Sequence, residues 1–188
     1  DGNRIHDLVL SYKYEGNYVP LRGKECSTQQ MPFISEKIPT FEEFANASIE
    51  EIYGEEIVDA YERKVTSFES IILINKGENK FEIEKLPPLA QSIPILTSDS
   101  YDINEDGYED VIVGGNIYNT EVETPRLDNQ FAIILISDKN KNYSTIGPDK
   151  SGLYLSGNTK SLKIIDRKNP KLLVANNNSN LEVFELNK

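Results

Sequence analysis

The sequence predicts a mainly β fold, in the form of a partial β-propeller of about three blades with the first and last incomplete, and with a small helical insertion. Two observations carry this prediction. A short apolar run that ends in a small residue occurs three times, and polar turns rich in Gly and Asn follow further apolar runs. Short apolar runs bounded by turn residues are typical of buried strands.

The recurring run occupies residues 7–11, 110–114 and 171–175, and a second apolar run follows each, at residues 70–74, 131–136 and 181–184. We therefore expect a strand pair in each of three units. Polar turns after the first two pairs predict hairpins, because Gly and Asn tolerate a positive φ at little cost. The strands that complete these hairpins are expected at residues 81–86 and 143–146, and inner strands are expected at residues 93–97 and 161–165.

Antiparallel units of about four strands that recur about every 60 residues favour propeller blades over a sandwich. Residues 118–129 are expected to be an added loop in the second unit. The prediction is one propeller-like domain over residues 1–188, cut from a longer protein because the first and last blades lack strands. An interrupted ring would leave open sheet edges, which predicts self-association through edge strands.

Residues 13–66 interrupt the first unit and are predicted to form a helical insertion. Thr40 followed by Glu43 matches a capping box, in which each side chain bonds the other residue's backbone N–H at a helix start. Ser48 and Gly54 are expected to begin and end a second short helix. This insertion would cover part of the β body.

Composition excludes several classes of function. The chain has 20 Lys and Arg against 31 Asp and Glu, a formal charge of −11, which repels phosphate backbones and argues against nucleic acid as a partner. Cys26 and His6 are the only residues of their types. Thiolate zinc clusters and multi-histidine metal sites are therefore excluded. No apolar run reaches the roughly 20 residues that span a bilayer, so the chain is not expected to cross a membrane.

The clearest chemical motif is residues 102–110, with the sequence DINEDGYED. Side-chain oxygens of Asp102, Asn104, Asp106 and Asp110 fall at positions 1, 3, 5 and 9, and the backbone carbonyl of Tyr108 falls at position 7. Calcium is a hard cation that takes six to eight oxygen ligands. The motif therefore predicts one calcium site, the only cofactor expected, with a plain Asn/Asp/Gly turn as the alternative. Magnesium is less suited, because it requires a tighter octahedron.

An EF-hand is excluded, because position 12 is Val113 and a β-branched run follows the motif where a helix would be needed. Gly107 at position 6 would allow the sharp turn. Residues 1–7 resemble the second half of such a loop, and whether they belong to a second calcium site stays open. Residues 166–171 occupy the same place in the third unit, but two lysines replace acidic donors there, so we expect no ion at that position.

The 102–110 motif ahead of a repeated strand resembles the calcium loop of FG-GAP or VCBS repeats, which form propeller blades. Residues 21–33, 114–116 and 121–128 are similar to the C-terminal propeller region of bacterial proteins related to cartilage acidic protein 1, the ASPIC/UnbV group. The resemblance implies an exported protein, extracellular, periplasmic or on the cell surface, whose propeller serves adhesion or ligand binding. It assigns calcium-ligand roles to Asp102, Asn104, Asp106, Tyr108 and Asp110.

The functional expectation is a calcium-stabilised extracellular binding or adhesion module without catalytic activity, with an unknown protein or glycan as its ligand. The alternative is a polysaccharide-active hydrolase or lyase, in which Glu42 with Glu43, or Glu121 with Glu123, would act as acid and base. Arg126 and Asp128 are expected to form a local ion pair rather than to contact a ligand.

Overall fold

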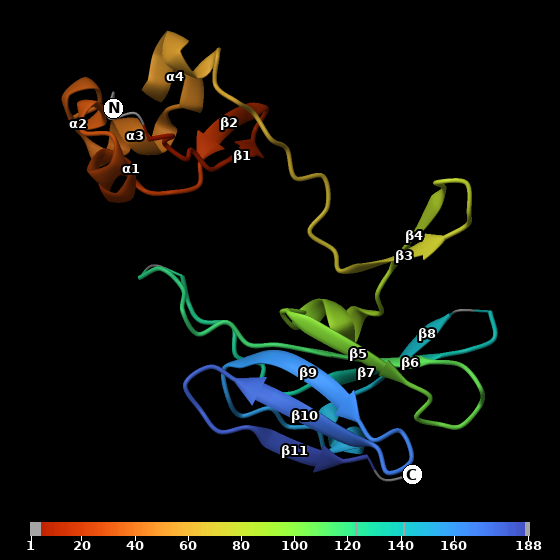
Figure 1. Ribbon diagram of the computed structural model, residues 1–188. Helices are drawn as coiled ribbons and strands as arrows, with labels where there is room; N and C mark the ends of the chain where they lie inside the picture. Colours follow the sequence, from red (N-terminus) through yellow and green to blue (C-terminus); the bar gives the residue numbers. More distant parts are fainter. Residues whose placement is uncertain (1–4, 123, 141, 187–188) are drawn as a thin grey trace. The chain divides into compact units, whose positions relative to one another are not determined.

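The computed structural model describes residues 5–122, 124–140 and 142–186, and the fold is mainly β, as the sequence predicts (Figure 1). The chain divides into two compact units, Asp1–Val65 (unit 1) and Thr66–Lys188 (unit 2). This division differs from the predicted single domain with an insertion. Residues 7–10 form no strand, and the β1–β2 hairpin that follows them belongs to unit 1.

Unit 1 is a short hairpin followed by small helices. Its elements are β1 (Ser11–Tyr14), β2 (Asn17–Pro20), α1 (Lys24–Gln30), α2 (Phe33–Lys37), α3 (Phe41–Asn46), α4 (Ile49–Tyr53) and η1 (Gly54–Ile57). One apolar cluster holds the helices together, with Ile34 and Ile52 fully buried at its centre. The helices are too short to be stable alone, so this cluster is the main source of their stability.

The predicted helix boundaries at residues 40, 48 and 54 are confirmed. Thr40 and Glu43 form a complete capping box before α3, and Ser48 and Glu51 form a second one before α4. Gly54, with φ of 68°, follows the last residue of α4. The helices α1 and α2 were not predicted, because no side chain caps either start and the sequence therefore gives no local signal for them.

The buried strand predicted at residues 7–11 is absent from the structure. Leu8 is 59% and Leu10 is 37% exposed, and regular strand begins only at Ser11. Glu15 and Gly16 both have positive φ, so the chain turns back and β1 pairs with β2. Only Val9 of the apolar run packs against the helical cluster. The run is therefore an approach to a local hairpin rather than the second strand of a blade.

The described residues of unit 2 form three antiparallel sheets. The first is the hairpin of β3 (Ile71–Asn75) and β4 (Phe81–Lys85), and the 3-10 helix η2 (Pro88–Ser92) follows it. The second has four strands in chain order, β5 (Thr97–Tyr101), β6 (Asp110–Gly114), β7 (Ile133–Ser137) and β8 (Tyr143–Ile146). After α5 (Pro148–Ser151) comes the third, in the order β11 (Glu182–Glu185), β10 (Lys171–Asn176), β9 (Thr159–Ile165).

Most strands lie where the sequence predicts them, but the inner strand predicted at residues 93–97 is wrong. The strand β5 begins at Thr97, and residues 93–95 pack their isoleucines into the core instead. Pro94 between those isoleucines lacks a backbone N–H for a sheet ladder. The apolar composition of residues 93–97 thus predicts a strand there, whereas the observed strand is the more polar segment that follows, Thr97–Tyr101.

The two halves of unit 2 follow the same succession of elements. The strands β3 and β7 begin 62 residues apart, and the same interval separates β4 from β8 and β5 from β9. Both hairpins are followed by a short helical turn that begins with proline, η2 in one case and α5 in the other.

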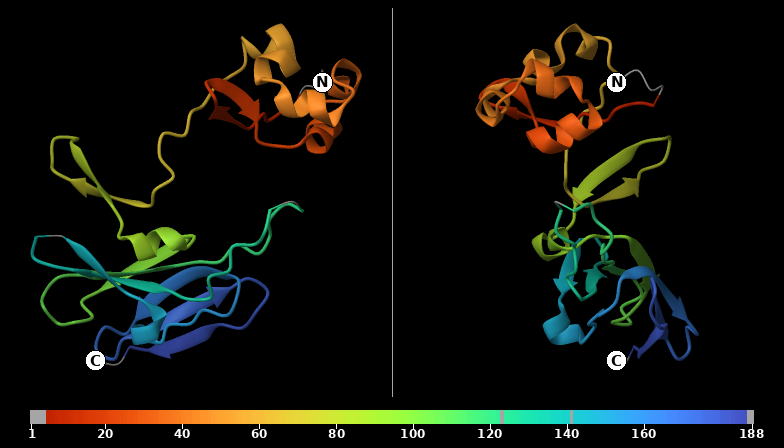
Figure 2. Two further views of the ribbon diagram at one scale, coloured as in Figure 1. Left: turned by 180° about the vertical axis from the view of Figure 1, so that it is seen from behind. Right: turned by 90° about the vertical axis from the view of Figure 1, so that its left-hand side faces the viewer.

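The core of unit 2 lies on both faces of the four-stranded sheet. One face packs against the three-stranded sheet (Figure 2). Ile112, Leu155 and Leu172 are fully buried in the cluster that joins the two sheets. The other face packs against η2 and the hairpin residue Ile72. The strands β6 and β7 are apolar on both sides for this reason. They are the most buried strands of the chain and form a rigid base for the loop that precedes β6.

Candidate metal-binding loop

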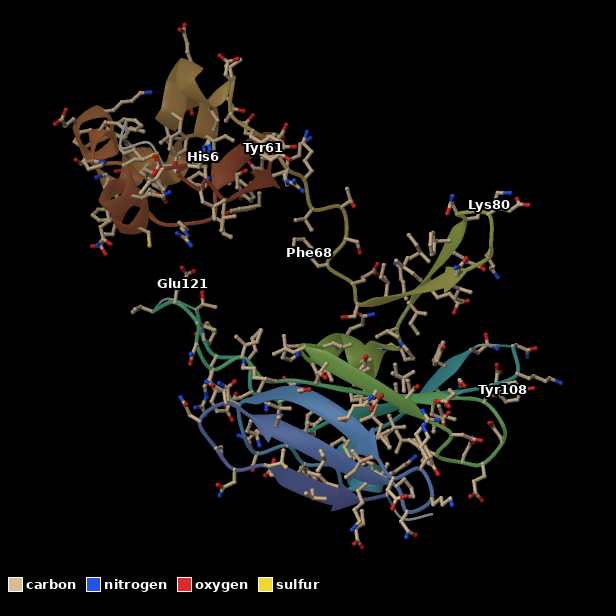
Figure 3. The ribbon with its side chains drawn as sticks, viewed as in Figure 1. His6, Tyr61, Phe68, Lys80, Tyr108 and Glu121 are labelled. Atoms are coloured by element: carbon tan, nitrogen blue, oxygen red, sulfur yellow. The ribbon has the colours of Figure 1, made fainter. Side chains whose placement is uncertain are left out.

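The predicted calcium motif forms the connection between β5 and β6, with Tyr108 on its surface (Figure 3). Glu105 and Gly107 adopt positive φ of 58° and 90°, which turns the chain sharply twice. Gly107 is the position that the sequence marks for such a turn, because glycine has no Cβ to clash there. The motif therefore folds as a compact loop on a strand-to-strand connection, which is the setting that the sequence predicts for it.

Hydrogen bonds within the loop order its first half. The two carboxylate oxygens of Asp102 accept the backbone N–H groups of Asp106 and Gly107, at 3.1 and 2.9 Å. The Asn104 Oδ1 accepts the same Asp106 N–H at 3.1 Å, and the Asp106 Oδ1 accepts the Tyr108 N–H at 2.9 Å. Each of these side chains stabilises a turn of the loop by accepting a backbone N–H from a residue a few positions further along, as Asn and Asp commonly do.

Asp110 ends the loop and is fully buried. Its Oδ2 accepts the backbone N–H of Ile103 at 3.0 Å, and its Oδ1 accepts the backbone N–H of Ser137 at 2.9 Å. The Ser137 hydroxyl in turn donates to the Glu109 carbonyl at 2.9 Å. One carboxylate thus connects the start of the loop, the first residue of β6 and the last residue of β7.

The donor chemistry of the loop fits a calcium ion. Each carboxylate has about four lone-pair sites, and those of Asp102 and Asp110 each accept the two hydrogen bonds given above. The Asp106 carboxylate also accepts two, because the Asn104 side-chain amide donates to its Oδ2 at 3.0 Å. Across residues 5–122, 124–140 and 142–186, however, no three His, Cys, Asp or Glu side chains are gathered around a common point suited to a metal. The loop residues are therefore close together in one ordered turn, and their oxygens point mainly at the backbone.

A second loop contacts this one from the three-stranded sheet. The Arg167 guanidinium donates to the Glu109 carboxylate at 2.9 Å, and the Tyr101 hydroxyl donates to the Arg167 carbonyl at 3.3 Å. The hydrogen bond from Arg167 lowers the pKa of Glu109. In the same loop Asp166 caps the turn by accepting the N–H groups of Lys168 and Asn169. For this loop the sequence predicted only that it holds no ion, and the contact with Glu109 was not predicted.

Asp99 is a structural carboxylate that the sequence did not reveal. It lies on β5, and its Oδ2 accepts the backbone N–H of Ile164 on β9 at 2.6 Å, while Lys163 forms an ion pair with it at 3.1 Å. Asp99 therefore links β5 and β9, which are edge strands of two different sheets. Burial raises the pKa of Asp99 most strongly, but the hydrogen bonds from Ile164, Lys163 and Ser100 together outweigh it and hold the pKa below its ordinary value.

The link through Asp99 predicts an acid-sensitive contribution to stability. Because the folded pKa lies below the unfolded value, this contribution is present above the unfolded pKa of about 3.9 and is lost as the pH falls through the lower folded pKa. We expect Asp99→Asn to be less stable than the native chain by about 1–2 kcal/mol at neutral pH. The difference should shrink as the pH falls below the unfolded value, when measured by urea unfolding at each pH. A difference that stays constant down to the acid limit would contradict the assignment.

Of the carboxylates considered for acid–base catalysis, the structure describes Glu42, Glu43 and Glu121. The Glu43 carboxylate is occupied in the capping box with Thr40, and Glu42 next to it is exposed on the helix. Glu121 accepts a hydrogen bond from the Thr124 hydroxyl at 3.0 Å, near the tip of the long loop that connects β6 and β7 (Figure 3). Its predicted partner, Glu123, lies outside the described residues, as do residues 1–4 of the second loop motif.

The predicted local ion pair between Arg126 and Asp128 is confirmed, with 2.6 Å between the Arg126 Nε and the Asp128 carboxylate. The same guanidinium lies over the Tyr118 ring, 4.8 Å from its centre. Backbone hydrogen bonds between Ile117 and Leu127 join the two arms of the added loop. These contacts give the loop an ordered base.

No protein-family model, curated protein or solved structure matches this chain. In the described part of the chain, no helix combines the length and the apolar character that crossing a membrane requires. The chain's own residues are therefore the basis for a functional proposal, and the loop between β5 and β6 is its best defined chemical feature.

Proposed function

We propose that this chain is a calcium-stabilised, extracellular binding or adhesion module without catalytic activity, with a single calcium site in the β5–β6 loop. The single observation that carries the proposal is the ordered acidic loop, whose donors at positions 1, 3 and 5 share one turn and whose last donor, Asp110, is buried between two strands. An acidic surface with a charge of −11 is also suited to a medium rich in cations.

Asp102, Asn104, Asp106 and Asp110 would hold the ion with their side-chain oxygens, and Tyr108 with its backbone carbonyl. When bound, calcium would supply positive charge that offsets the repulsion between the loop carboxylates. The chain's own residues already connect the loop to β6 and β7 through Asp110 and Ser137. Ordering the exposed half of the loop would therefore also stabilise the sheet behind it.

We further propose that unit 2 is a set of consecutive propeller blades of the FG-GAP or VCBS type. Two features support this proposal. The element succession recurs at an interval of 62 residues, and the four-stranded sheet packs face to face with the three-stranded sheet. The site on a β5–β6 connection corresponds to the place of the calcium loop in such blades. A protein or glycan ligand and an exported location follow from the same proposal.

The calcium proposal is tested by thermal unfolding of the full chain in chelator and in increasing calcium. Calcium at about ten times its Kd adds about 1.4 kcal/mol to a folded state that alone binds it. We expect Tm to rise by several degrees. Asp106→Ala should abolish the rise, because it removes one of the proposed calcium ligands. The substitution should disturb little else, because Asp106 is exposed and makes only local contacts.

Asp138→Ala is the matched control for this experiment. Asp138 also caps a polar turn, accepting the N–H groups of Asn140 and Asn142 at 2.7 and 2.9 Å, but its turn lacks the spaced donors of the motif. We expect this variant to keep the full response to calcium even if its Tm in chelator is lower. A native chain whose Tm is the same in chelator and in millimolar calcium would refute the proposed site.

A further inference from the structure

The turn between β9 and β10, residues 166–170, places a positive charge against the β5–β6 loop (Figure 1). Residues 102–110 include no Lys or Arg and five carboxylates, at Asp102, Glu105, Asp106, Glu109 and Asp110. The turn contributes Arg167, whose Nη1 lies 2.9 Å from the Glu109 Oε1. Carboxylates gathered in one short loop repel each other, so a guanidinium beside them offsets part of the repulsion when no metal ion is bound.

Two backbone contacts hold Arg167 in this position. Its Nη2 donates to the Ser100 carbonyl at 3.4 Å, and its own carbonyl accepts the Tyr101 hydroxyl at 3.3 Å. Ser100 and Tyr101 are the last two residues of β5, directly before the loop begins at Asp102. Arg167 is therefore fixed both to the start of the loop and, through Glu109, to its end.

Glu109 is not one of the proposed calcium ligands, but it lies between two of them, Tyr108 and Asp110. The charge of Arg167 would therefore act on a bound calcium ion through space and not by occupying a ligand oxygen. Two cations near one another repel, which weakens the binding of the second. The Arg167 side chain is 65% exposed, so removing it opens no cavity and changes mainly the charge.

We propose that Arg167 regulates the β5–β6 loop by lowering its affinity for calcium. The inference rests on the proposed function, since it concerns the same site. A loop with three ligand carboxylates and an opposing guanidinium is expected to bind calcium with a Kd of about 0.1–1 mM, the range of extracellular modules. A site of this strength is occupied in a calcium-rich medium and empty in a calcium-poor one, so the stability of the module would follow the calcium concentration.

The direction of the effect separates this role from a merely structural one. If Arg167 only held the loop in shape, Arg167→Gln would loosen the loop and weaken calcium binding. If its charge opposes the ion, the same variant binds calcium more tightly, although it has lost the ion pair with Glu109. Glu109→Gln leaves the guanidinium without its counter-charge and should therefore bind calcium more weakly than the native chain.

Calorimetric titration of the full chain with calcium at low ionic strength tests the proposal. We expect Arg167→Gln to lower the Kd for calcium about two- to fivefold and Glu109→Gln to raise it by a similar factor. The double variant should return close to the native Kd, because the two removed charges cancel. At about 1 M salt the differences between the variants should largely disappear, since both side chains are exposed and their charges are then screened.

Lys80→Gln is the matched control, because it removes the same charge from another exposed ion pair, with Glu78 at 3.2 Å on the β3–β4 hairpin. Its Kd should equal that of the native chain. If Arg167→Gln binds calcium no more tightly than the native chain at low ionic strength, or if Lys80→Gln tightens binding equally, the role of Arg167 is refuted while the calcium site stands. A native chain that binds no calcium refutes the proposed function itself, and the role of Arg167 with it.

Discussion

Asp110→Ala is expected to lower the free energy of unfolding of unit 2 by about 3–5 kcal/mol in calcium-free buffer. The substitution leaves the N–H groups of Ile103 and Ser137 without their acceptor, and Ser137 is itself buried. An orphaned buried donor loses its hydrogen bond and keeps the cost of desolvation, and hydrogen bonds to a charged acceptor are the stronger kind. Urea unfolding in the presence of chelator measures the loss directly.

Two further variants separate the structural role of Asp110 from a metal role. In chelator Asp106→Ala should lose less than about 1 kcal/mol, because Asp106 is exposed and makes only local hydrogen bonds. Asp110→Asn keeps one acceptor oxygen and should fall between the native chain and the alanine variant. If Asp110→Ala proved no less stable in chelator than Asp106→Ala, the carboxylate would not be the connection between the loop and the two strands that its contacts indicate.

Ile112→Ala is expected to destabilise unit 2 by about 2–5 kcal/mol. Ile112 is fully buried in β6, in the cluster that joins the four-stranded and three-stranded sheets. Removing three carbons there opens a cavity, and strands packed on both faces cannot move together to fill it. Urea unfolding followed by circular dichroism gives the change in free energy.

Two variants serve as comparisons for Ile112→Ala: a smaller truncation at the same position, and the same truncation at an exposed isoleucine. Ile112→Val should lose only about 0.5–1.5 kcal/mol, because one methyl group leaves a small cavity. Ile83→Ala removes the same atoms from a side chain that is 65% exposed, so its loss of unfolding free energy should be much smaller than that of Ile112→Ala. Equal losses at residues 83 and 112 would contradict a shared core between the two sheets.

Local signals allowed many elements to be predicted from sequence. The capping boxes at Thr40 and Ser48 lie within four residues of the backbone groups they bond, so the pattern alone specifies the helix starts. The strand β6 and the β3–β4 and β7–β8 hairpins were predicted for the same reason, since each combines an apolar run with a nearby turn. The acidic loop was also found this way, because all of its residues are contiguous.

The contacts that connect the loop to the rest of unit 2 could not be predicted in this way. Ser137 and Asp99 are unremarkable in the sequence, and they matter because the sheet registers place them beside Asp110 and Ile164. The error at residues 7–11 has the same origin, for an apolar run of that composition suits either a blade strand or the approach to a hairpin. The composition of an apolar run does not determine which other segment it pairs with or packs against.

By itself the sequence determined the mainly β class, the helix caps, the tight turns and the acidic loop between two strands. Only the tertiary structure decided the division into two units, the strand that each run pairs with and the carboxylates that join one sheet to the next. The physical reason is the range of the interactions. Caps and turns are satisfied by residues a few positions apart, whereas the partners of buried strands and of Asp110 are selected by packing across tens of residues.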